Sequence, residues 1–248
     1  MTAFAFVFPG QGSQAVGMLD AWGDHPAVTE TLREASDAMG EDLARLIHEG
    51  PKEALALTTN TQPVMLVAGV AAWRVWRAEG GALPAAVAGH SLGEYSALVA
   101  SGVLTLAQAA PLVRFRAAAM QEAVPVGTGA MAAILGMDAE RVRAGCADVT
   151  ASFAPGSGEV VEAVNFNDPA QTVIAGSKAA VEKACEALKA AGAKRALPLP
   201  VSAPFHSSLM KPAAERLRER LATTAFAAPQ IPLINNIDVA VESDADRI

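Results

Sequence analysis

A serine that could act as a nucleophile lies in a tight glycine turn at residues 89–93, Gly-His-Ser-Leu-Gly. The apolar residues 85–88 before this turn are typical of a short buried strand, and residues 94–100 after it are typical of a helix. In such a strand–turn–helix the hydroxyl of Ser91 projects above the sheet, where it could attack an acyl carbon. The two glycines are expected because a Cβ at either position would collide with the neighbouring strand or helix. The helix N-terminus would favour the developing oxyanion, whereas a chance match of five common residues is the alternative.

A serine nucleophile needs a base, and His206 is the best candidate. It follows a predicted strand at residues 196–201 and precedes a predicted helix at residues 211–222. The other histidines either adjoin the serine or lie in polar surface stretches: His25, His48 and His90. A structural histidine is the alternative interpretation of His206.

One arginine is predicted on the apolar face of a helix at residues 105–122. At about 100° per residue, Arg116 falls near the centre of an apolar arc, whereas Arg114 points the opposite way. A guanidinium in that position needs a partner because burying an unpaired charge is costly. The partner is either a carboxylate of the protein or an anionic group of the substrate, held by two parallel hydrogen bonds.

The elements that would position these residues form two groups. In the first, a buried strand at residues 3–8 leads into a glycine-rich turn at residues 9–14. Open α/β sheets build their sites at the carboxyl ends of such strands, and a phosphate loop is disfavoured because no Gly-Lys-Ser/Thr follows. Helices are expected at residues 26–39, 52–57 and 60–76, the last with Asn60 as its N-terminal cap, and a final short strand at residues 231–236.

The second group of elements begins near residue 128. Strands and helices are predicted in the order β-α-β-β-α-β, which is the ferredoxin-like order. The strands are expected at residues 130–135, 160–165, 172–176 and 196–201, and the helices at residues 138–149 and 179–191. A turn at residues 167–169 joins the second and third strands.

Composition excludes several classes of protein. The 248 residues are 52% hydrophobic and 18% charged, enough for one large domain or one domain with an insertion. A net charge of −7 argues against nucleic-acid binding. The two cysteines have no metal-ligand spacing, which favours a reduced cytoplasmic setting. Neither a signal peptide nor a membrane span is predicted.

Several segments together resemble the malonyl-CoA:acyl carrier protein transacylases and the related polyketide-synthase acyltransferases. The matching residues are 6–13 (Phe-Val-Phe-Pro-Gly-Gln-Gly-Ser), 89–95 (Gly-His-Ser-Leu-Gly-Glu-Tyr), Arg116 with 120–121 (Met-Gln), 127–131 (Gly-Thr-Gly-Ala-Met), 165–167 (Asn-Phe-Asn) and 204–206 (Pro-Phe-His). The resemblance implies an α/β fold with an α/β-hydrolase-like large subdomain, which has a parallel sheet and a nucleophile elbow. It also implies an inserted ferredoxin-like small subdomain. The large subdomain would comprise residues 1–126 and 197–248, and the small one residues 127–196.

The resemblance also implies an activity: transfer of malonyl from malonyl-CoA to the phosphopantetheine thiol of acyl carrier protein, through a malonyl-serine intermediate, in fatty-acid biosynthesis. Ser91 would be the nucleophile and His206 the base. The implied oxyanion donors are the backbone N–H groups of Gln11 and Leu92. The implied substrate-binding residues are Arg116, which would hold the malonate carboxylate, and Phe205, Met120 and Asn165. No cofactor or metal is implied, and a cytoplasmic monomer is expected.

The carrier protein of this family is acidic, so a local basic surface must attract it to this acidic chain. The densest cationic residues of the inserted unit and its junction are Lys183, Lys189, Lys194 and Arg195.

One feature departs from the family, and three alternative functions stay open. In the family, a later segment supplies the carbonyl that orients the histidine, and this chain ends at Ile248 before it, so the C-terminal part of the large subdomain is expected to be missing.

An esterase or thioesterase on the same turn would need an acid between Ser91 and His206, for which Asp138, Asp148 and Asp168 are available. Further alternatives are a polyketide-type acyltransferase with another extender unit and a non-catalytic module that binds carrier protein.

Overall fold

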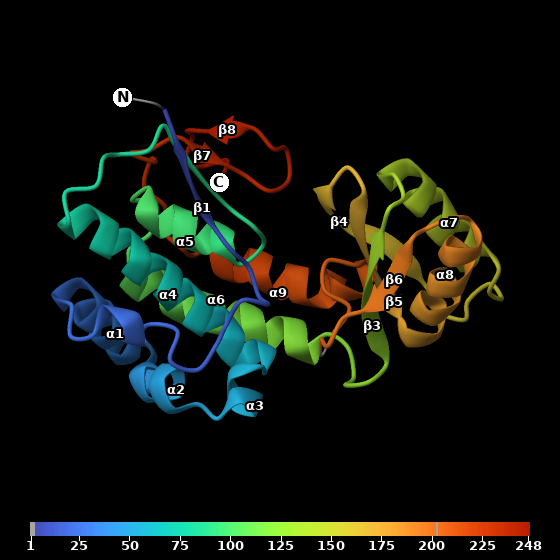
Figure 1. The fold of residues 1–248 in the computed structure, drawn as a ribbon, viewed down its shortest axis with the longest axis horizontal. Coiled ribbons are helices and arrows are strands. Elements are labelled where there is room, and N and C mark those ends of the chain that lie inside the picture. Colours follow the sequence, from blue (N-terminus) through green and yellow to red (C-terminus); the bar gives the residue numbers. More distant parts are fainter. Residues whose placement is uncertain (1–2, 202) are drawn as a thin grey trace. The chain divides into compact units, whose positions relative to one another are not determined.

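The computed structural model describes residues 3–201 and 203–248. Contacts between residues divide the chain into two compact units (Figure 1). The larger unit contains residues 1–117 and 220–248, and the smaller unit contains residues 118–219. Each unit has its own four-stranded sheet, one containing parallel strands and the other antiparallel throughout, so the fold is mixed α/β as expected.

The sheet of the larger unit brings three strand ends to one edge. Its order is β1 (Ala5–Phe8), β2 (Ala86–Gly89), β7 (Leu233–Ile234) and β8 (Val241–Glu242). The first three strands are parallel, with Phe8 opposite Gly89 and Ala88 opposite Ile234. The segments that follow β1, β2 and β7 therefore emerge beside one another. The antiparallel strand β8 was not expected, and the strand expected at residues 231–236 is only two residues long.

Helices cover this sheet, and two of them, α1 and α2, begin after a residue whose side chain caps the helix. The helices are α1 (Pro26–Met39), α2 (Leu43–Glu49), α3 (Lys52–Leu55), α4 (Thr58–Ala78), α5 (Gly93–Ala100) and α6 (Leu106–Glu122). Short 3-10 turns occupy Asp20–Trp22 and Ser208–Met210. Helix α1 matches the predicted bounds, with a proline at its first position and a left-handed Gly40 after its last. Helix α2, whose N-cap is Asp42, was not expected.

The start of α4 corrects one prediction. Asn60 does not cap this helix: α4 begins two residues earlier, and the Asn60 side-chain amide donates to the Ala54 carbonyl instead. Pro63 therefore lies inside the helix, where it cannot bond the carbonyl of Thr59. Arg114 of α6 donates to that carbonyl, so the proline is tolerated because a side chain replaces the missing helical donor.

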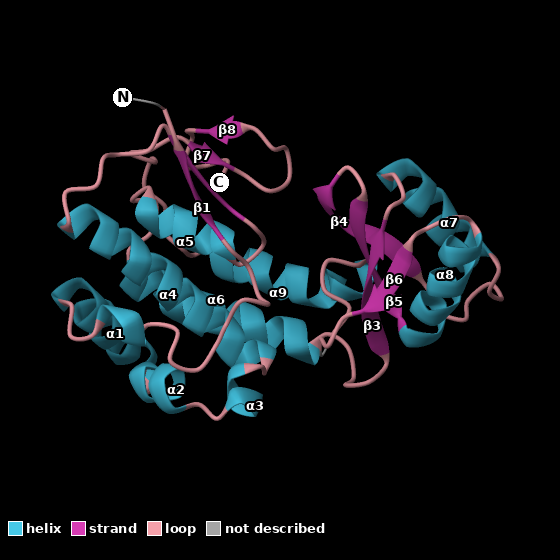
Figure 2. Ribbon diagram, viewed as in Figure 1, coloured by secondary structure: helices cyan, strands magenta, loops and turns pink. Residues whose placement is uncertain are grey.

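The smaller unit has the expected β-α-β-β-α-β order. Its elements are β3 (Gly129–Leu135), α7 (Ala139–Ala151), β4 (Val161–Asp168), β5 (Gln171–Ser177), α8 (Lys178–Ala190) and β6 (Arg195–Pro198). The sheet order is β4-β5-β3-β6, and α7 and α8 lie on one of its faces (Figure 2). Strand β4 continues to Asp168, so the turn expected at residues 167–169 begins later than predicted.

The smaller unit is wider than the expected small subdomain. Residues 118–126 and 197–219 group with it, and the unit boundaries fall within α6 and within α9 (Lys211–Leu221). The reason is an apolar cluster in which the C-terminal part of α6 packs with the segment after β6. Its buried members include Ala119, Met120, Ala203, Phe205, Met210 and Ala213. Among the described residues, no helix is long and apolar enough to cross a membrane.

Candidate active site

The predicted nucleophile lies in a strained turn whose glycines have no room for a side chain. Strand β2 ends at Gly89 and α5 begins at Gly93, with Ser91 between them at a φ of 52°. A Cβ on Gly89 would lie 2.0 Å from the carbonyl carbon of Gly93, and a Cβ on Gly93 would lie 2.1 Å from the carbonyl oxygen of Phe8. Both predicted collisions are confirmed. The serine is thus held at a sharp bend between β2 and α5, next to the end of β1.

Asn236, two residues after β7, forms two hydrogen bonds to this turn and one to Glu94 in the first turn of α5. Its side-chain Oδ1 accepts from the backbone N–H of Ser91 at 2.7 Å, and its Nδ2 donates to the carbonyl of Gly89. Its own backbone N–H donates to Oε1 of Glu94 at 3.3 Å. The turn and the start of α5 are therefore bonded to a segment about 145 residues away in sequence.

Arg116 is buried beside Ser91, as its position on the helical arc predicts. Its side chain is 8% exposed, and Nη2 donates to the hydroxyl oxygen of Ser91 at 3.1 Å. Nη1 donates to the amide oxygen of Gln62, and the guanidinium carbon lies 5.7 Å from the centre of the Tyr95 ring.

These contacts bear on the two interpretations of Arg116. Among the described residues, no carboxylate forms an ion pair with Arg116. Its partners are an amide, a hydroxyl and an aromatic ring. A buried cation whose contacts are neutral can still take an anionic ligand, which favours a substrate group over a structural ion pair.

We call the turn at residues 89–93 the elbow. Burial shifts the pKa values of three groups around it. It lowers the pKa of the Arg116 guanidinium, while the negative forms of Tyr95 and Glu94 act in the opposite direction. Burial raises the pKa of the Glu94 carboxyl, opposed by the hydrogen bond from the Asn236 N–H and by the charge of Arg116. Burial also raises the pKa of the Tyr95 hydroxyl. The surroundings of Ser91 are therefore poorly hydrated, which strengthens electrostatic interactions there.

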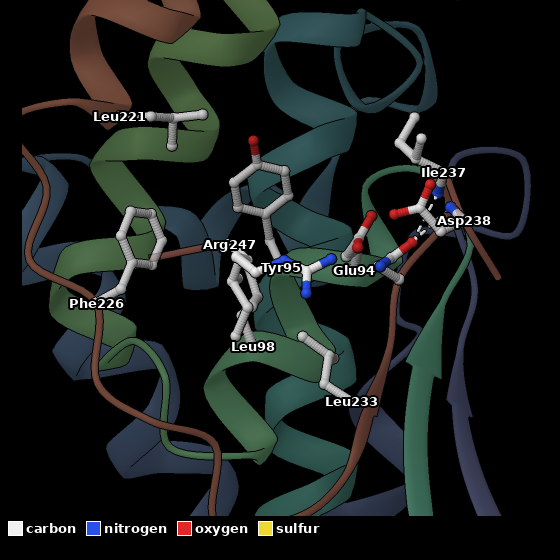
Figure 3. Close-up of a pocket in the computed structure, with 11 residues that line it drawn as sticks. Glu94, Tyr95, Leu98, Leu221, Phe226, Leu233, Ile237, Asp238 and Arg247 are labelled. Atoms are coloured by element: carbon white, nitrogen blue, oxygen red, sulfur yellow. Dashed lines mark hydrogen bonds between the residues drawn. The ribbon is translucent and has the colours of Figure 1, made fainter. Parts of the chain in front are cut away.

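A cavity of about 340 Å³ lies against α5 (Figure 3). Glu94 and Tyr95 line it together with apolar residues and the turn after β7. Ser91 and Arg116 are not among its lining residues, so the Ser91 hydroxyl does not open into this cavity.

The two predicted oxyanion donors lie on either side of the elbow. Leu92 is fully buried as the residue before α5, and Gln11 lies in the exposed turn after β1. That turn packs onto the elbow, since a Cβ on Gly10 would lie 2.8 Å from the His90 carbonyl oxygen. The Gln11 side chain donates to Oγ1 of Thr58 at 2.7 Å. Neither backbone N–H donates a hydrogen bond to another residue in the described part of the chain.

The remaining predicted residues lie in the smaller unit. His206 is exposed and has a φ of 66°. Only Ser91, His206 and Val239 among the described non-glycine residues have a positive φ, a conformation that is costly and often found at functional sites. Ser91 and His206 belong to different units, and their pairing stays a prediction.

Three substrate-binding candidates also lie in the smaller unit. Phe205 and Met120 are 6% and 8% exposed in one apolar cluster, and Asn165 is half-buried on β4. Their roles likewise stay predictions.

Sequence reasoning missed three residues that contact Ser91 or Arg116: Gln62, Tyr95 and Asn236. Asn236 could have been found, because polar residues after a parallel strand are a signal of a site. Gln62 gave no such signal, because a glutamine near the start of a helix usually faces solvent. Groups of three or more potential metal ligands are absent from the residues the structure describes.

Comparison with known proteins gives a consistent result. A model of the family described as acyl transferase domain matches residues 5–246. The malonyl CoA-acyl carrier protein transacylase of Salmonella typhimurium is 56% identical, over 100% of this chain and 79% of that protein. The protein of the same name from Bacillus subtilis is 46% identical, over 98% of this chain and 75% of its own length.

Two solved structures are similar over almost the whole chain. An acyl-carrier-protein S-malonyltransferase from Burkholderia pseudomallei has a TM-score of 0.94 and 63% identity, covering 99% of this chain and 78% of that one. A malonyl-transacylase in complex with a type II polyketide-synthase acyl-carrier protein has a TM-score of 0.94 and 53% identity, with the same coverage.

Proposed function

The chain belongs to the acyl transferase family, and we propose that it moves malonyl groups from malonyl-CoA to acyl carrier protein for fatty-acid synthesis. The observation that carries this proposal is the hydrogen bond from the buried Arg116 guanidinium to the hydroxyl of Ser91. A cation adjacent to an acyl-transfer nucleophile selects an acyl group that carries its own anion. An apolar acyl chain would gain nothing from that cation and would leave it buried against hydrocarbon.

The first half-reaction acylates the enzyme. The Ser91 oxygen attacks the thioester carbonyl carbon of malonyl-CoA while His206 takes the hydroxyl proton. The tetrahedral intermediate collapses with cleavage of the carbon–sulfur bond, and His206 returns the proton to the departing CoA sulfur. CoA leaves as the thiol, and malonate remains as an ester on Ser91.

The second half-reaction reverses the same steps with a different thiol. The phosphopantetheine thiol of acyl carrier protein gives its proton to His206, and its sulfur attacks the ester carbonyl. The ester carbon–oxygen bond breaks, and the Ser91 oxygen recovers the proton. The malonyl group ends on the carrier protein, and the free enzyme is restored.

Backbone N–H groups and Arg116 bind the two negatively charged ends of the reacting malonyl group. The N–H groups of Leu92 and Gln11 hold the oxyanion of each tetrahedral intermediate, supported by the position of Leu92 at the start of α5. Arg116 holds the distal carboxylate, and Gln62 keeps the guanidinium in place. Phe205, Met120 and Asn165 complete the acyl pocket, with Phe205 limiting substitution beside the chain.

The same proposal extends to the fold and the setting. The larger sheet and its elbow form an α/β-hydrolase-like subdomain at residues 1–126 and 197–248, and residues 127–196 form a ferredoxin-like insertion. The similar malonyl-transacylase solved with its acyl-carrier protein supports the same type of partner here. The enzyme works as a cytoplasmic monomer and uses no cofactor.

Mass spectrometry after brief exposure to malonyl-CoA tests the function. A malonyl adduct on Ser91 that disappears when holo acyl carrier protein is added supports transfer. Rapid release of free malonate in place of transfer would instead indicate a thioesterase, and absence of any adduct would indicate a binding module. Ser91→Ala should give no adduct and keep its fold, because a smaller side chain adds no collision at the elbow.

A further inference from the structure

The amide of Asn236 matches both backbone groups that the elbow exposes towards it. The Gly89 carbonyl lies at the start of the turn and the Ser91 N–H at its centre, one an acceptor and the other a donor. An asparagine amide carries one acceptor and one donor on the same planar group, so it can satisfy both at once. An aspartate would repel the Gly89 carbonyl, and an aliphatic residue would satisfy neither.

The turn after β7 is built to present this amide. The β2–β7 pairing places Ala88 opposite Ile234, so the residue two positions after Ile234 reaches the elbow. The side-chain Oδ1 of Asn235 accepts from the backbone N–H groups of Ile237 and Asp238 at 3.1 and 2.7 Å (Figure 3). Asn235 thus closes the turn by local hydrogen bonds, while Asn236 points its amide out of the turn.

The hydrogen bond between the Ser91 N–H and Asn236 determines which backbone N–H groups can bind the oxyanion. Ser91 has a positive φ, a conformation that costs energy in a non-glycine residue unless the surroundings hold it. With its N–H bonded to Asn236, the elbow cannot turn this group towards a developing oxyanion. The neighbouring N–H of Leu92 remains for that role, and the direction of the Ser91 Cα–Cβ bond is fixed.

We infer that Asn236 is a positioning residue: its side-chain amide holds the elbow so that the Ser91 hydroxyl points at the acyl carbon and Leu92 at the oxyanion. It does not touch the substrate. The inference rests on the proposed malonyl transfer, because enzyme acylation by malonyl-CoA is the assay. The hydrogen bonds of Asn236 bear only on the reactivity of Ser91.

Stopped-flow or quench measurement of enzyme acylation by malonyl-CoA separates positioning from stability. The burst amplitude counts folded active sites, whereas the burst rate constant reports how well each site reacts. Asn236→Ala should lower the rate constant about a hundredfold, the size of effect that follows from misplacing a reacting group by about 1 Å. The amplitude should stay near that of the wild type, and the KM for malonyl-CoA should change little because Arg116 is intact.

A matched pair of charge changes supplies the control. Asn236→Asp keeps an oxygen that can accept from the Ser91 N–H, but it loses the donor to Gly89 and adds a negative charge that repels that carbonyl, so it should slow acylation by at least tenfold. Asn235→Asp introduces the same charge one residue earlier and keeps an oxygen that accepts from Ile237 and Asp238, so its rate constant should stay within about threefold of the wild type. Equal rate constants for the two aspartate variants, or a loss confined to burst amplitude, would overturn the inference.

A second readout keeps this result distinct from failure of the proposed function. A fluorophosphonate probe labels activated serines without any need for malonyl-CoA. If the wild type gives no malonyl burst, malonyl transfer is wrong, and the labelling rates still rank the variants. Labelling of Asn236→Ala as fast as the wild type would remove Asn236 from the positioning of Ser91.

Discussion

The guanidinium of Arg116 donates to the hydroxyl oxygen of Ser91 at 3.1 Å. Arg116, which we propose binds the carboxylate end of the acyl group, therefore contacts the Ser91 oxygen, which we propose attacks the carbonyl end. This closeness means that a bound carboxylate and the reacting carbonyl must be separated by a short spacer. It also means that a carboxylate taking over this guanidinium N–H frees the serine oxygen for attack.

Replacing Arg116 should change which acyl group is transferred. A charge-assisted bidentate pair contributes about 1.5–3 kcal/mol, so Arg116→Ala should lose ten- to over a hundredfold in malonyl transfer. Acetyl-CoA should improve relative to malonyl-CoA, because a neutral acyl group no longer leaves a buried cation unsatisfied. Arg116→Lys should rescue poorly, since an ammonium cannot reproduce the planar fork. Competition between the two thioesters measures the ratio, and an equal loss for both would make Arg116 a structural residue.

The short distance between the Arg116 guanidinium and the Ser91 oxygen should limit the length of the acyl group. One methylene separates the carboxylate from the thioester carbonyl in malonyl-CoA, and succinyl-CoA adds a second. The extra carbon would move the carbonyl away from Ser91 once the carboxylate is bound, so kcat/KM should fall about tenfold or more. Steady-state transfer to carrier protein with each thioester is the measurement. Comparable values for malonyl and succinyl groups would contradict this use of the short contact.

Local rules predict part of this site well. The glycines of the elbow follow from steric exclusion within a few residues, and the burial of Arg116 follows from the period of one helix. The β-α-β-β-α-β order follows from alternating apolar segments that are long enough to show their period. These features could be predicted because each is determined by neighbours in sequence.

Other features depend on contacts between distant segments and could not be predicted in the same way. Strand β8 has two residues, too few to show any periodicity. The start of α4 depends on Arg114, which lies 55 residues from the carbonyl that it satisfies. Asn236 bonds to a turn about 145 residues away, and only the pairing of β2 with β7 brings the two together.

The elbow glycines should matter for chemistry beyond their effect on stability. Gly93→Ala would place a Cβ 2.1 Å from the Phe8 carbonyl oxygen, so the turn must shift, at a cost of about 1–3 kcal/mol. Gly156→Ala is a matched control, because Gly156 has a φ of 80° and open space around its Cβ position, so only backbone strain of about 1–2 kcal/mol is added. Both variants should therefore lose some thermal stability, but only Gly93→Ala should lose acylation of Ser91. Full acylation of Gly93→Ala would show that the elbow tolerates the shift.

The raised pKa of the Glu94 carboxyl makes a prediction about pH and stability. A carboxyl whose pKa is higher in the folded protein than in the unfolded chain favours folding at low pH, and this contribution is lost as pH rises through the folded pKa. Glu94→Gln mimics the protonated form and can still accept from the Asn236 N–H. Thermal midpoints of wild type and variant should therefore agree below the ordinary pKa of glutamic acid, and the variant should be more stable at neutral pH.

An exposed residue provides the control for that experiment. Glu182→Gln on α8 removes the same charge from an exposed position, so it controls for the loss of one negative charge without the release of a buried carboxylate. A Glu94→Gln variant that is less stable than the wild type at neutral pH would mean that attraction to Arg116 outweighs burial of the carboxylate.

Carrier protein should be attracted by cations of the smaller unit. Lys189 and Lys194 are exposed, whereas Lys183 already donates to the Ser152 hydroxyl and lies 4.8 Å from the Phe153 ring. Reversing the first two charges in Lys189→Glu/Lys194→Glu should raise the KM for an acidic carrier protein severalfold, and more at low salt, because screening shortens the reach of the field. Malonyl-CoA kinetics should not change, because Ser91 and Arg116 are untouched.

The matched control for the carrier-protein experiment reverses two exposed charges of the larger unit, Arg33→Glu/Lys52→Glu. It lowers the net charge by the same four units, so any effect of overall repulsion between two acidic proteins appears in both double variants. A rise in KM confined to Lys189→Glu/Lys194→Glu places the docking surface on the smaller unit. An equal rise in both variants would mean that net charge alone governs the encounter, and that the cations around α8 have no specific role in docking.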